Sequence, residues 1–231
     1  MDDLSNRVRA ELFKLGADIV GFGDLRGLPS EARDGLPTGI CVAVKYPPAV
    51  IRGIAELPTR EYREWYDRLN ERLDFVVTEG ASFIKGLGFG AVAQTRAKVG
   101  TGEAGYDTAL PHKTVATRAG VGWIGKSALL VTEEYGSMLR LSTILTDAPL
   151  ETSEPIDASR CGGCSICAGA CPAGAISGGL WAVGLRRDDF FDPAKCAKTA
   201  KERSRRGFGD DVTICGKCIE VCPYARRVLG K

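Results

Sequence analysis

Hydrophobic and polar residues alternate along the first two thirds of the chain in a way that predicts both helices and strands. Apolar residues recur every three or four positions over residues 4–15, just ahead of Gly16, and over residues 59–84, which predicts two amphipathic helices. Short apolar runs bounded by glycine or proline predict strands instead. We expect such strands at 18–22, 39–46, 89–94 and 138–146. Residues 1–150 are therefore predicted to form an α/β domain with a mixed sheet.

The character of the chain changes near residue 151. Residues 147–155 form a polar connection that contains Pro149 and ends at Pro155, and the segment after it is rich in cysteine, glycine and alanine. A segment with so little apolar periodicity has difficulty building a core of its own, so bound clusters would have to cross-link it. We therefore expect a second domain at 151–231.

Composition sets the class of protein. With 231 residues, 44% of them hydrophobic and 26% charged, the chain can bury a sizeable core and is not expected to be disordered. No apolar run approaches the roughly 18–20 residues that span a bilayer, and the acidic start has no signal-peptide pattern, so we expect a cytoplasmic protein without membrane contact. The net charge of +2 gives no strong nucleic-acid signature.

Eight of the nine cysteines lie after residue 160, in two groups and one isolated position. The first group has the spacing C-x2-C-x2-C-x3-C-P, which is the bacterial ferredoxin signature for a [4Fe–4S] cluster. The second group has the spacing C-x2-C-x3-C-P, and the isolated Cys196 stands 19 positions before Cys215. In a reducing compartment, cysteines at this density bind metal rather than form disulfides.

In a ferredoxin signature, three thiolates wrap one cluster and the fourth ligates the other. Cysteine set 1 is therefore expected to comprise Cys161, Cys164, Cys167 and Cys222. Cysteine set 2 is expected to comprise Cys171, Cys196, Cys215 and Cys218. The alternative of two four-cysteine zinc sites is disfavoured, because zinc sites pair C-x2-C units across a longer spacer. Cys41, in the middle of a predicted strand, is interpreted as a buried small hydrophobic residue.

A glycine-rich stretch at 120–126 follows a predicted helix at 111–119. The positions Gly120-x-Gly122-x-x-Gly125 formally match the dinucleotide fingerprint, but that fingerprint follows a strand, not a helix. The glycines either form a plain structural turn or let the backbone approach a large planar ligand or a cluster. Both alternatives remain open at the level of sequence.

Residues 119–126, 129–136 and 141–150, together with the cysteine pattern, resemble the tRNA epoxyqueuosine reductase family and, more distantly, the reductive dehalogenases. The likeness runs from about residue 100 to 225. It implies an α+β fold, in which a nitroreductase-like, corrinoid-binding domain precedes a bacterial two-[4Fe–4S] ferredoxin module and cobalamin lies between them. The cofactor-binding residues expected on this basis are His112, Lys113, Gly120, Gly122, Trp123, Gly125 and Lys126.

The resemblance also implies a catalytic acid. Asp107, followed by Thr108, matches the family acid that precedes the glycine loop, and burial would raise its pKa for protonating a departing oxygen. Pro111, His112 and Lys113 depart from the family pattern, so His112 or Lys113 is an alternative proton donor. The plain alternatives are a helix or turn cap for Asp107 and a first-turn surface position for His112.

The resulting hypothesis is an oxidoreductase that depends on cobalamin and resembles epoxyqueuosine reductase. An external low-potential donor would supply electrons through both clusters, with set 2 nearer the corrin, and the substrate would be a small molecule, a corrinoid or a modified nucleoside. The alternative is a ferredoxin-like carrier or a corrinoid reductase without an organic substrate.

The family pattern continues into C-terminal helical repeats that help to hold tRNA, whereas this sequence stops at Lys231. We therefore expect a short form, with tRNA kept only as a further alternative substrate. A basic run at 195–206 would contact RNA, an acidic electron donor or only solvent.

Overall fold

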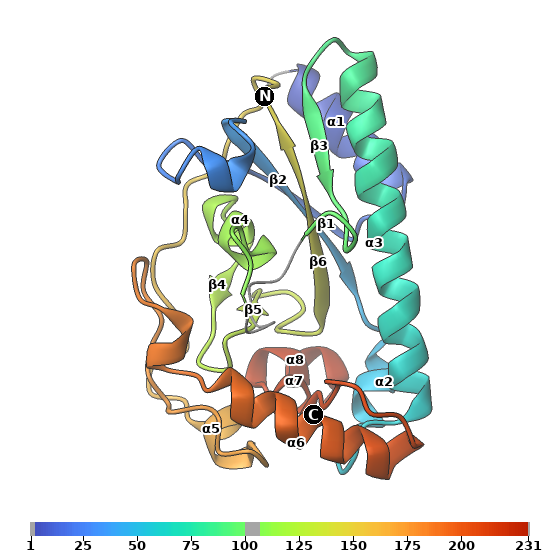
Figure 1. Cartoon of the computed structure of the whole chain (residues 1–231), viewed down its shortest axis with the longest axis vertical. Helices are drawn as coiled ribbons and strands as arrows, with labels where there is room; N and C mark the ends of the chain where they lie inside the picture. The colour runs from blue at the N-terminus through green and yellow to red at the C-terminus, as the bar shows by residue number, and fades with distance from the viewer. Residues whose placement is uncertain (1–2, 100–106, 231) are drawn as a thin grey trace. The chain divides into compact units, whose positions relative to one another are not determined.

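The computed structural model describes residues 3–99 and 107–230 (Figure 1). The chain forms two compact units that are interleaved along the sequence. Unit 1 takes its residues from Met1–Val44, Leu69–Gly122 and Arg140–Ile156, and unit 2 from Lys45–Arg68, Trp123–Leu139 and Asp157–Lys231. The sequence predicted a single boundary at 150–151. Two segments of the first 150 residues, 45–68 and 123–139, here called the excursions, nevertheless belong to unit 2. The cysteine-rich segment thereby gains the apolar partners that its own composition lacks.

Unit 1 is built on a four-stranded sheet in the order β1-β2-β6-β3. The strands are β1 (Ile19–Asp24), β2 (Thr38–Lys45), β3 (Ala91–Gln94) and β6 (Leu139–Thr146). β1 pairs with β2 and β3 pairs with β6, and both pairings are antiparallel. The sequence predicted a mixed sheet, which requires a parallel pair of strands, and neither of these two pairs is parallel. The predicted α+β class is confirmed.

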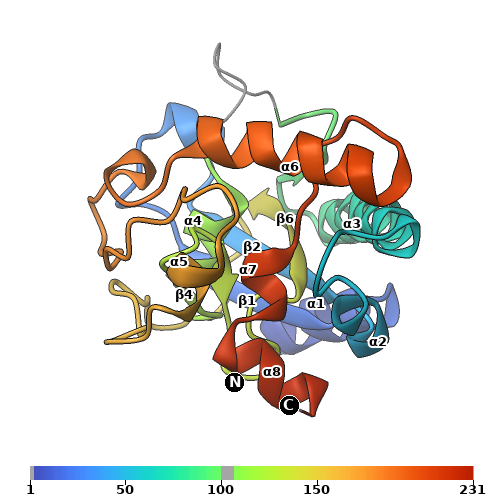
Figure 2. The ribbon, with the colours of Figure 1, turned by 90° about the horizontal axis from the view of Figure 1, so that it is seen from below.

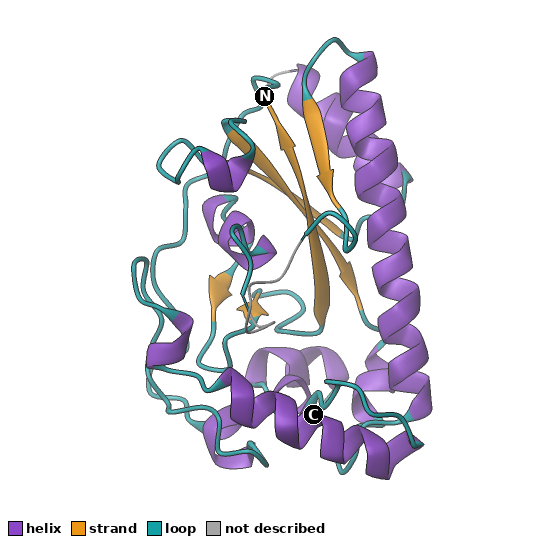
Figure 3. Cartoon of the chain, in the orientation of Figure 1, coloured by secondary structure: helices purple, strands orange, loops and turns teal. Residues whose placement is uncertain are grey.

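Helices cover both faces of this sheet (Figure 3). They are α1 (Asp3–Lys14), the long α3 (Arg60–Gly86), which starts in unit 2, α4 (His112–Arg118) and a short η1 (Glu31–Arg33). A Cβ at Gly80 of α3 would meet Leu12 of α1 and Ile144 of β6, so these three elements pack closely on one face. A Cβ at Gly21 of β1 would meet residues that follow α4, which places α4 on the other face.

The patterning of the sequence predicted these elements well. Each helix and strand expected in unit 1 is present, and its bounds differ by at most two residues from those expected. The long helix turns the apolar side chains of Tyr62, Leu69, Leu73 and Val76 inward, as its period of three to four residues indicated.

Unit 2 consists of short elements joined by loops. They are α2 (Pro48–Arg52), β4 (Trp123–Ile124), β5 (Leu130–Val131), α5 (Ile166–Ala170), η2 (Arg187–Asp189), α6 (Pro193–Phe208), α7 (Lys217–Glu220) and α8 (Pro223–Leu229). Proline occupies the first position of α6 and α8, where the missing N–H costs nothing. Figure 2 shows α5 beside α7 and α7 leading directly into α8. Within the described residues, no helix is long and apolar enough to cross a membrane.

Glycines allow the segments of unit 2 to approach one another closely. A Cβ at Gly136 would collide with the backbone of Ala225 in α8, and a Cβ at Gly207 of α6 would collide with the carbonyl of Pro58. Gly136 also has a φ of +57°, which other residues adopt only with strain. The two excursions, 45–68 and 123–139, are therefore packed directly against the cysteine-rich segment.

Candidate cluster-binding site

The structure gathers the cysteines of set 1 from two distant parts of the sequence. Cys161, Cys164 and Cys167 lie in and just before α5, whereas Cys222 precedes the first residue of α8. The pKa of the Cys167 thiol is raised to about 11, first by burial and then by the charges of Cys161, Cys222 and Cys164. The three neighbours that act on Cys167 are the other members of set 1.

The cysteines of set 2 are gathered in the same way. The pKa of Cys196 on α6 is raised to about 11, first by burial and then by Cys215 and Cys171. Burial also raises the pKa of Cys218, with further contributions from Cys215, Cys196, Cys167 and Cys171. Helix α7, which carries Cys218, contacts helix α5, which carries Cys167, so the two sets are neighbours.

The donor set fits iron–sulfur clusters. Thiolates that crowd together in a partly buried loop repel one another unless cations neutralise them, and cysteine thiolates are the usual ligands of iron–sulfur cubes. All eight cysteines are free thiols and none is fully buried. Among residues 3–99 and 107–230, no three histidine, cysteine or acidic side chains converge closely enough to hold a single metal ion. A four-iron cube binds its ligands at four separate corners, so it does not require such convergence.

The glycines of the loop at 120–126 differ in conformation and in surroundings. Gly120 has a φ of +63° and follows the end of α4, where its N–H bonds to the Thr117 carbonyl, so it has the conformation of a turn that ends a helix. A Cβ at Gly125 would lie 3.5 Å from the sulfur of Cys161, so this glycine lets the loop approach a predicted cluster ligand. Gly122 between them is buried.

Trp123 and Lys126 of the same loop are both buried. The Trp123 ring meets the ring of Tyr224 edge-on at 5.0 Å, and the guanidinium of Arg160 lies 5.7 Å from the Trp123 ring. Tyr224 directly follows the last C-P pair, so the aromatic contact connects the glycine loop to the start of α8. The Trp123 Nε1 is buried without a hydrogen-bond partner among the described residues.

Glu220 lies between Cys218 and Cys222 and was not among the residues predicted from the sequence. Its side chain is only 2% exposed and pairs with Lys217 at 3.1 Å and Arg226 at 3.4 Å. Lys217 also donates to the Ala55 carbonyl at 2.6 Å, so the pair joins the second cysteine group to the 45–68 excursion. The only sequence signal was the apolar character of its neighbours, Ile219 and Val221.

The other predicted site residues lie in unit 1. Asp107 is exposed, so the burial expected of a family acid is not present here, and its catalytic role stays a prediction. His112 is the first residue of α4, and its Nδ1 lies 2.9 Å from the Thr143 hydroxyl. Burial and then the charge of Arg140 lower the pKa of His112 to about 4, against an opposing effect of Asp74. A neutral imidazole is a poor proton donor at pH 7, and the neighbouring Lys113 is half-buried.

Comparison with known proteins agrees with the cysteine geometry. Residues 160–225 match the family described as "4Fe-4S double cluster binding domain". The epoxyqueuosine reductase of Bacillus subtilis is 31% identical over 161 residues, which cover 70% of this chain and 38% of that protein. That of Pseudomonas aeruginosa is 26% identical over 217 residues, which cover 90% of this chain and 56% of that protein.

The chain is related to the epoxyqueuosine reductases. It spans between about a third and just over half of the length of these curated relatives. Within it, residues 160–225 form a domain for two [4Fe–4S] clusters, as the cysteine spacing predicted. Which cysteine binds which cluster stays a prediction.

Several solved structures share the fold of this chain. The catabolic reductive dehalogenase NpRdhA in complex with 3-bromo-4-hydroxybenzoic acid matches 96% of this chain, with a TM-score of 0.69 and 20% identity, over 33% of its own length. An epoxyqueuosine reductase with a modified tRNA-Tyr stem loop matches 97% of this chain, with a TM-score of 0.61 and 22% identity, over 66% of its own length. Identities this low support the shared fold alone.

Proposed function

We propose that the protein is an iron–sulfur, cobalamin-dependent reductase that resembles epoxyqueuosine reductase and acts on a small molecule or a modified nucleoside. The observation that supports this most is that a double-cluster domain occurs in a chain whose whole fold resembles enzymes of this kind. A reductive dehalogenase described as B12-dependent matches 96% of the chain, with a TM-score of 0.66. A carrier of electrons alone needs only the cluster domain, so the additional unit 1 favours an enzyme.

The cysteine sets would act in series. Set 1 lies in the loop with the greater exposure, because Gly162, Gly163 and Gly169 have open space around them. An external low-potential donor would therefore deliver electrons to set 1. Set 2, whose Cys218 is affected by the charge of Cys167, would receive them and lie nearer the corrin. The proximity of the sets is what single-electron transfer between them requires.

Two buried donors in unit 2 fit a ligand rich in hydrogen-bond acceptors, as cobalamin is through its amide side chains. They are the unpartnered Nε1 of Trp123 and the buried ammonium of Lys126. Bound cobalamin would supply a cobalt centre that accepts single electrons and reduces the substrate. The residues proposed to hold it are His112, Lys113, Gly120, Gly122, Trp123, Gly125 and Lys126. Asp107 is proposed to deliver the proton, for which its exposed carboxyl has to lose water when substrate binds.

An anaerobic titration of the cluster-loaded protein with cob(II)alamin tests this proposal. We expect a saturable shift of the corrin absorption bands near one equivalent. Asp107→Asn should leave that shift and the cluster spectrum unchanged while abolishing turnover of any substrate found. Unchanged corrin bands would contradict the proposal and favour an electron carrier instead. Unimpaired turnover in Asp107→Asn would remove the proton-donor role only.

A second candidate keeps tRNA as the substrate, because the matched relatives are epoxyqueuosine reductases and one structure holds a tRNA stem loop. The basic run on α6 divides into two kinds of residue. Arg203 donates to the Glu56 carbonyl and Arg205 pairs with Asp211, so these two have partners within the protein. Lys198, Lys201 and Arg206 are exposed, and no ion pair involves them within the described residues.

Replacing Lys198, Lys201 and Arg206 together with glutamine tests the tRNA candidate. If this face of α6 contacts phosphates, tRNA binding should weaken and its dependence on salt should fall by about 0.7–0.9 in log–log slope for each lost contact. Filter binding across salt concentrations measures the slope, and Arg205→Gln is the control. Absence of tRNA binding by the unmodified protein at low salt would remove this candidate.

A further inference from the structure

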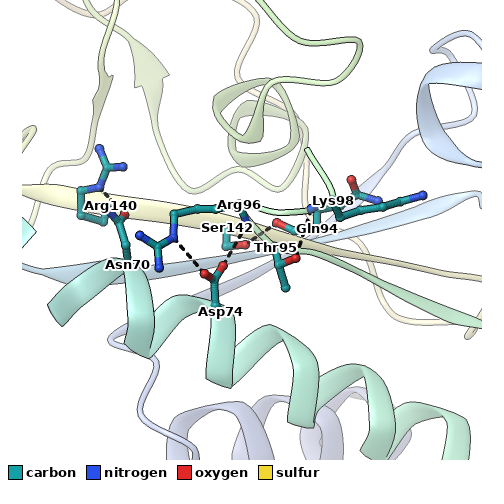
Figure 4. Close-up of polar contacts among 8 residues, drawn as sticks. All are labelled: Asn70, Asp74, Gln94, Thr95, Arg96, Lys98, Arg140 and Ser142. Atoms are coloured by element: carbon teal, nitrogen blue, oxygen red, sulfur yellow. Dashed lines mark hydrogen bonds and ion pairs between the residues drawn. The ribbon is translucent and has the colours of Figure 1, made fainter. Parts of the chain in front are cut away.

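Asn70 on α3 has a buried hydrogen-bond donor without an acceptor. The residue is 3% exposed, and its Oδ1 accepts a hydrogen bond from Arg140 Nε at 3.0 Å (Figure 4). This bond fixes the orientation of the amide, because exchanging its oxygen and nitrogen would set two donors against each other. The Nδ2 is then buried with no partner among the described residues. Burying a donor without an acceptor destabilises the folded state by about 1–3 kcal/mol, which indicates that a bound ligand supplies the acceptor.

Asp74, one helical turn further along α3, holds a second guanidinium, that of Arg96, which follows β3. Asp74 accepts hydrogen bonds from the backbone N–H and the Nε of Arg96, at 3.0 and 2.8 Å (Figure 4). Residues four apart on a helix have Cβ atoms about 5–6 Å apart on one face. Asn70 and Asp74 are such a pair, and each accepts a hydrogen bond from one guanidinium, that of Arg140 and that of Arg96 (Figure 4). The Arg96 side chain is 52% exposed, which leaves it accessible to a ligand.

His112 adds a neutral polar group to the same place. Its imidazole is close enough to Arg140 and Asp74 for both charges to act on it, and its Nδ1 is already engaged with Thr143. The polar groups further along the sheet edge satisfy one another. Ser142 donates to the Gln94 carbonyl at 2.9 Å, and the Lys98 ammonium pairs with Asp34 at 3.6 Å. Among the described residues at this edge of the sheet, the Asn70 amide is therefore the buried donor that still lacks an acceptor.

We propose that Asn70, Arg96, His112 and Arg140, here called the amide–guanidinium site, bind the carboxylate of a small organic acid. A carboxylate has two coplanar oxygens, so it can accept from the Asn70 amide and from a guanidinium at once. A neutral carbonyl would satisfy the amide and leave the guanidinium attraction unused. A phosphate dianion would lose more hydration energy beside the buried Asn70 amide.

The site rests on the proposed function in one respect only, namely that the bound acid is the substrate to be reduced. Binding of a carboxylate requires neither cobalamin nor turnover. The amide–guanidinium site lies within unit 1, and its four residues come from α3, α4, β6 and the residues after β3. Its occupancy can therefore be measured separately from the cofactor.

Equilibrium dialysis of the cluster-loaded protein, without cobalamin, against radiolabelled benzoate tests the site. We expect saturable binding of one benzoate per chain, displacement by acetate, and at least tenfold weaker competition by benzamide and by inorganic phosphate. Arg96→Gln and Arg140→Gln should each weaken benzoate binding at least tenfold. Lys98→Gln, a change to an exposed cation in the same unit, should leave it unchanged.

A second readout uses the single histidine of the chain. Benzoate bound beside His112 should raise the pKa of its imidazole in an NMR titration, whereas benzamide should not. No saturable binding of either benzoate or acetate would overturn the proposal, as would equal competition by benzamide or phosphate. If cobalamin binds but benzoate does not, only this site is rejected. If benzoate binds but cobalamin does not, the site stands and the proposed function fails.

Discussion

Replacing Cys222 with serine is expected to remove the cluster of set 1 and to leave that of set 2 in place. In the sequence, Cys222 belongs to the second cysteine group, yet in the structure its thiolate acts on Cys167 of the first group. Loss of one ligand from a four-cysteine set destabilises that cluster alone. Iron content should therefore fall from about eight to about four atoms per chain, measured by iron analysis and by spectroscopy of the reduced protein.

Two further variants control this experiment. Cys171→Ser should remove the other cluster, although Cys171 is part of the first group in the sequence. Cys41→Ser should change neither, because Cys41 lies buried in β2, far along the chain from the cysteine-rich segment. If Cys222→Ser and Cys215→Ser abolished the same spectroscopic signal, the division into sets 1 and 2 would be wrong.

Replacing Glu220 with glutamine is expected to lower the free energy of unfolding by about 3 kcal/mol. The carboxylate is buried and pairs with two cations, Lys217 and Arg226. Breaking a buried ion pair by removing one partner costs about 3–5 kcal/mol. We expect the lower end, because both cations retain contact with water. Urea unfolding of the cluster-loaded protein measures the change.

Glu133→Gln is the matched control for Glu220→Gln. Glu133 also pairs with an arginine, Arg160, at 3.0 Å, but its side chain is 71% exposed. An exposed pair of this kind contributes about 0–1 kcal/mol, so its loss should barely change the unfolding midpoint. Equal effects of the two substitutions would show that Glu220 does not carry the stability assigned to it.

The features that could be predicted from sequence are those that depend on near neighbours in the chain. Helix α3 and strand β6 follow from the spacing of their apolar residues. The cluster domain follows from the spacing of Cys161, Cys164, Cys167 and Cys171, because a tight loop has to wrap a cube of fixed size.

The features that escaped prediction depend on contacts between distant residues. Asn70 and Arg140 are 70 positions apart, and nothing in either local sequence indicates that their side chains bond. Glu220 resembles an ordinary surface glutamate until Lys217 and Arg226 are placed beside it. The two compact units also differ from a simple division at 150–151, since composition marks where the cysteine-rich segment starts but not which earlier segments pack with it.

Because the two units are interleaved along the sequence, the cysteine-rich segment of this protein is not expected to fold when it is expressed alone. Cutting the chain at the polar connection would leave behind the segments 45–68 and 123–139, and with them the Ala55 carbonyl that holds Lys217 and the Gly136 backbone that receives α8. A fragment beginning at Asp157 would thus be an incomplete scaffold rather than a small ferredoxin. Conversely, oxidative loss of iron would destabilise the packing of residues 45–68, although this segment precedes every cluster cysteine in the sequence. Residues 45–68 would then become accessible to proteases.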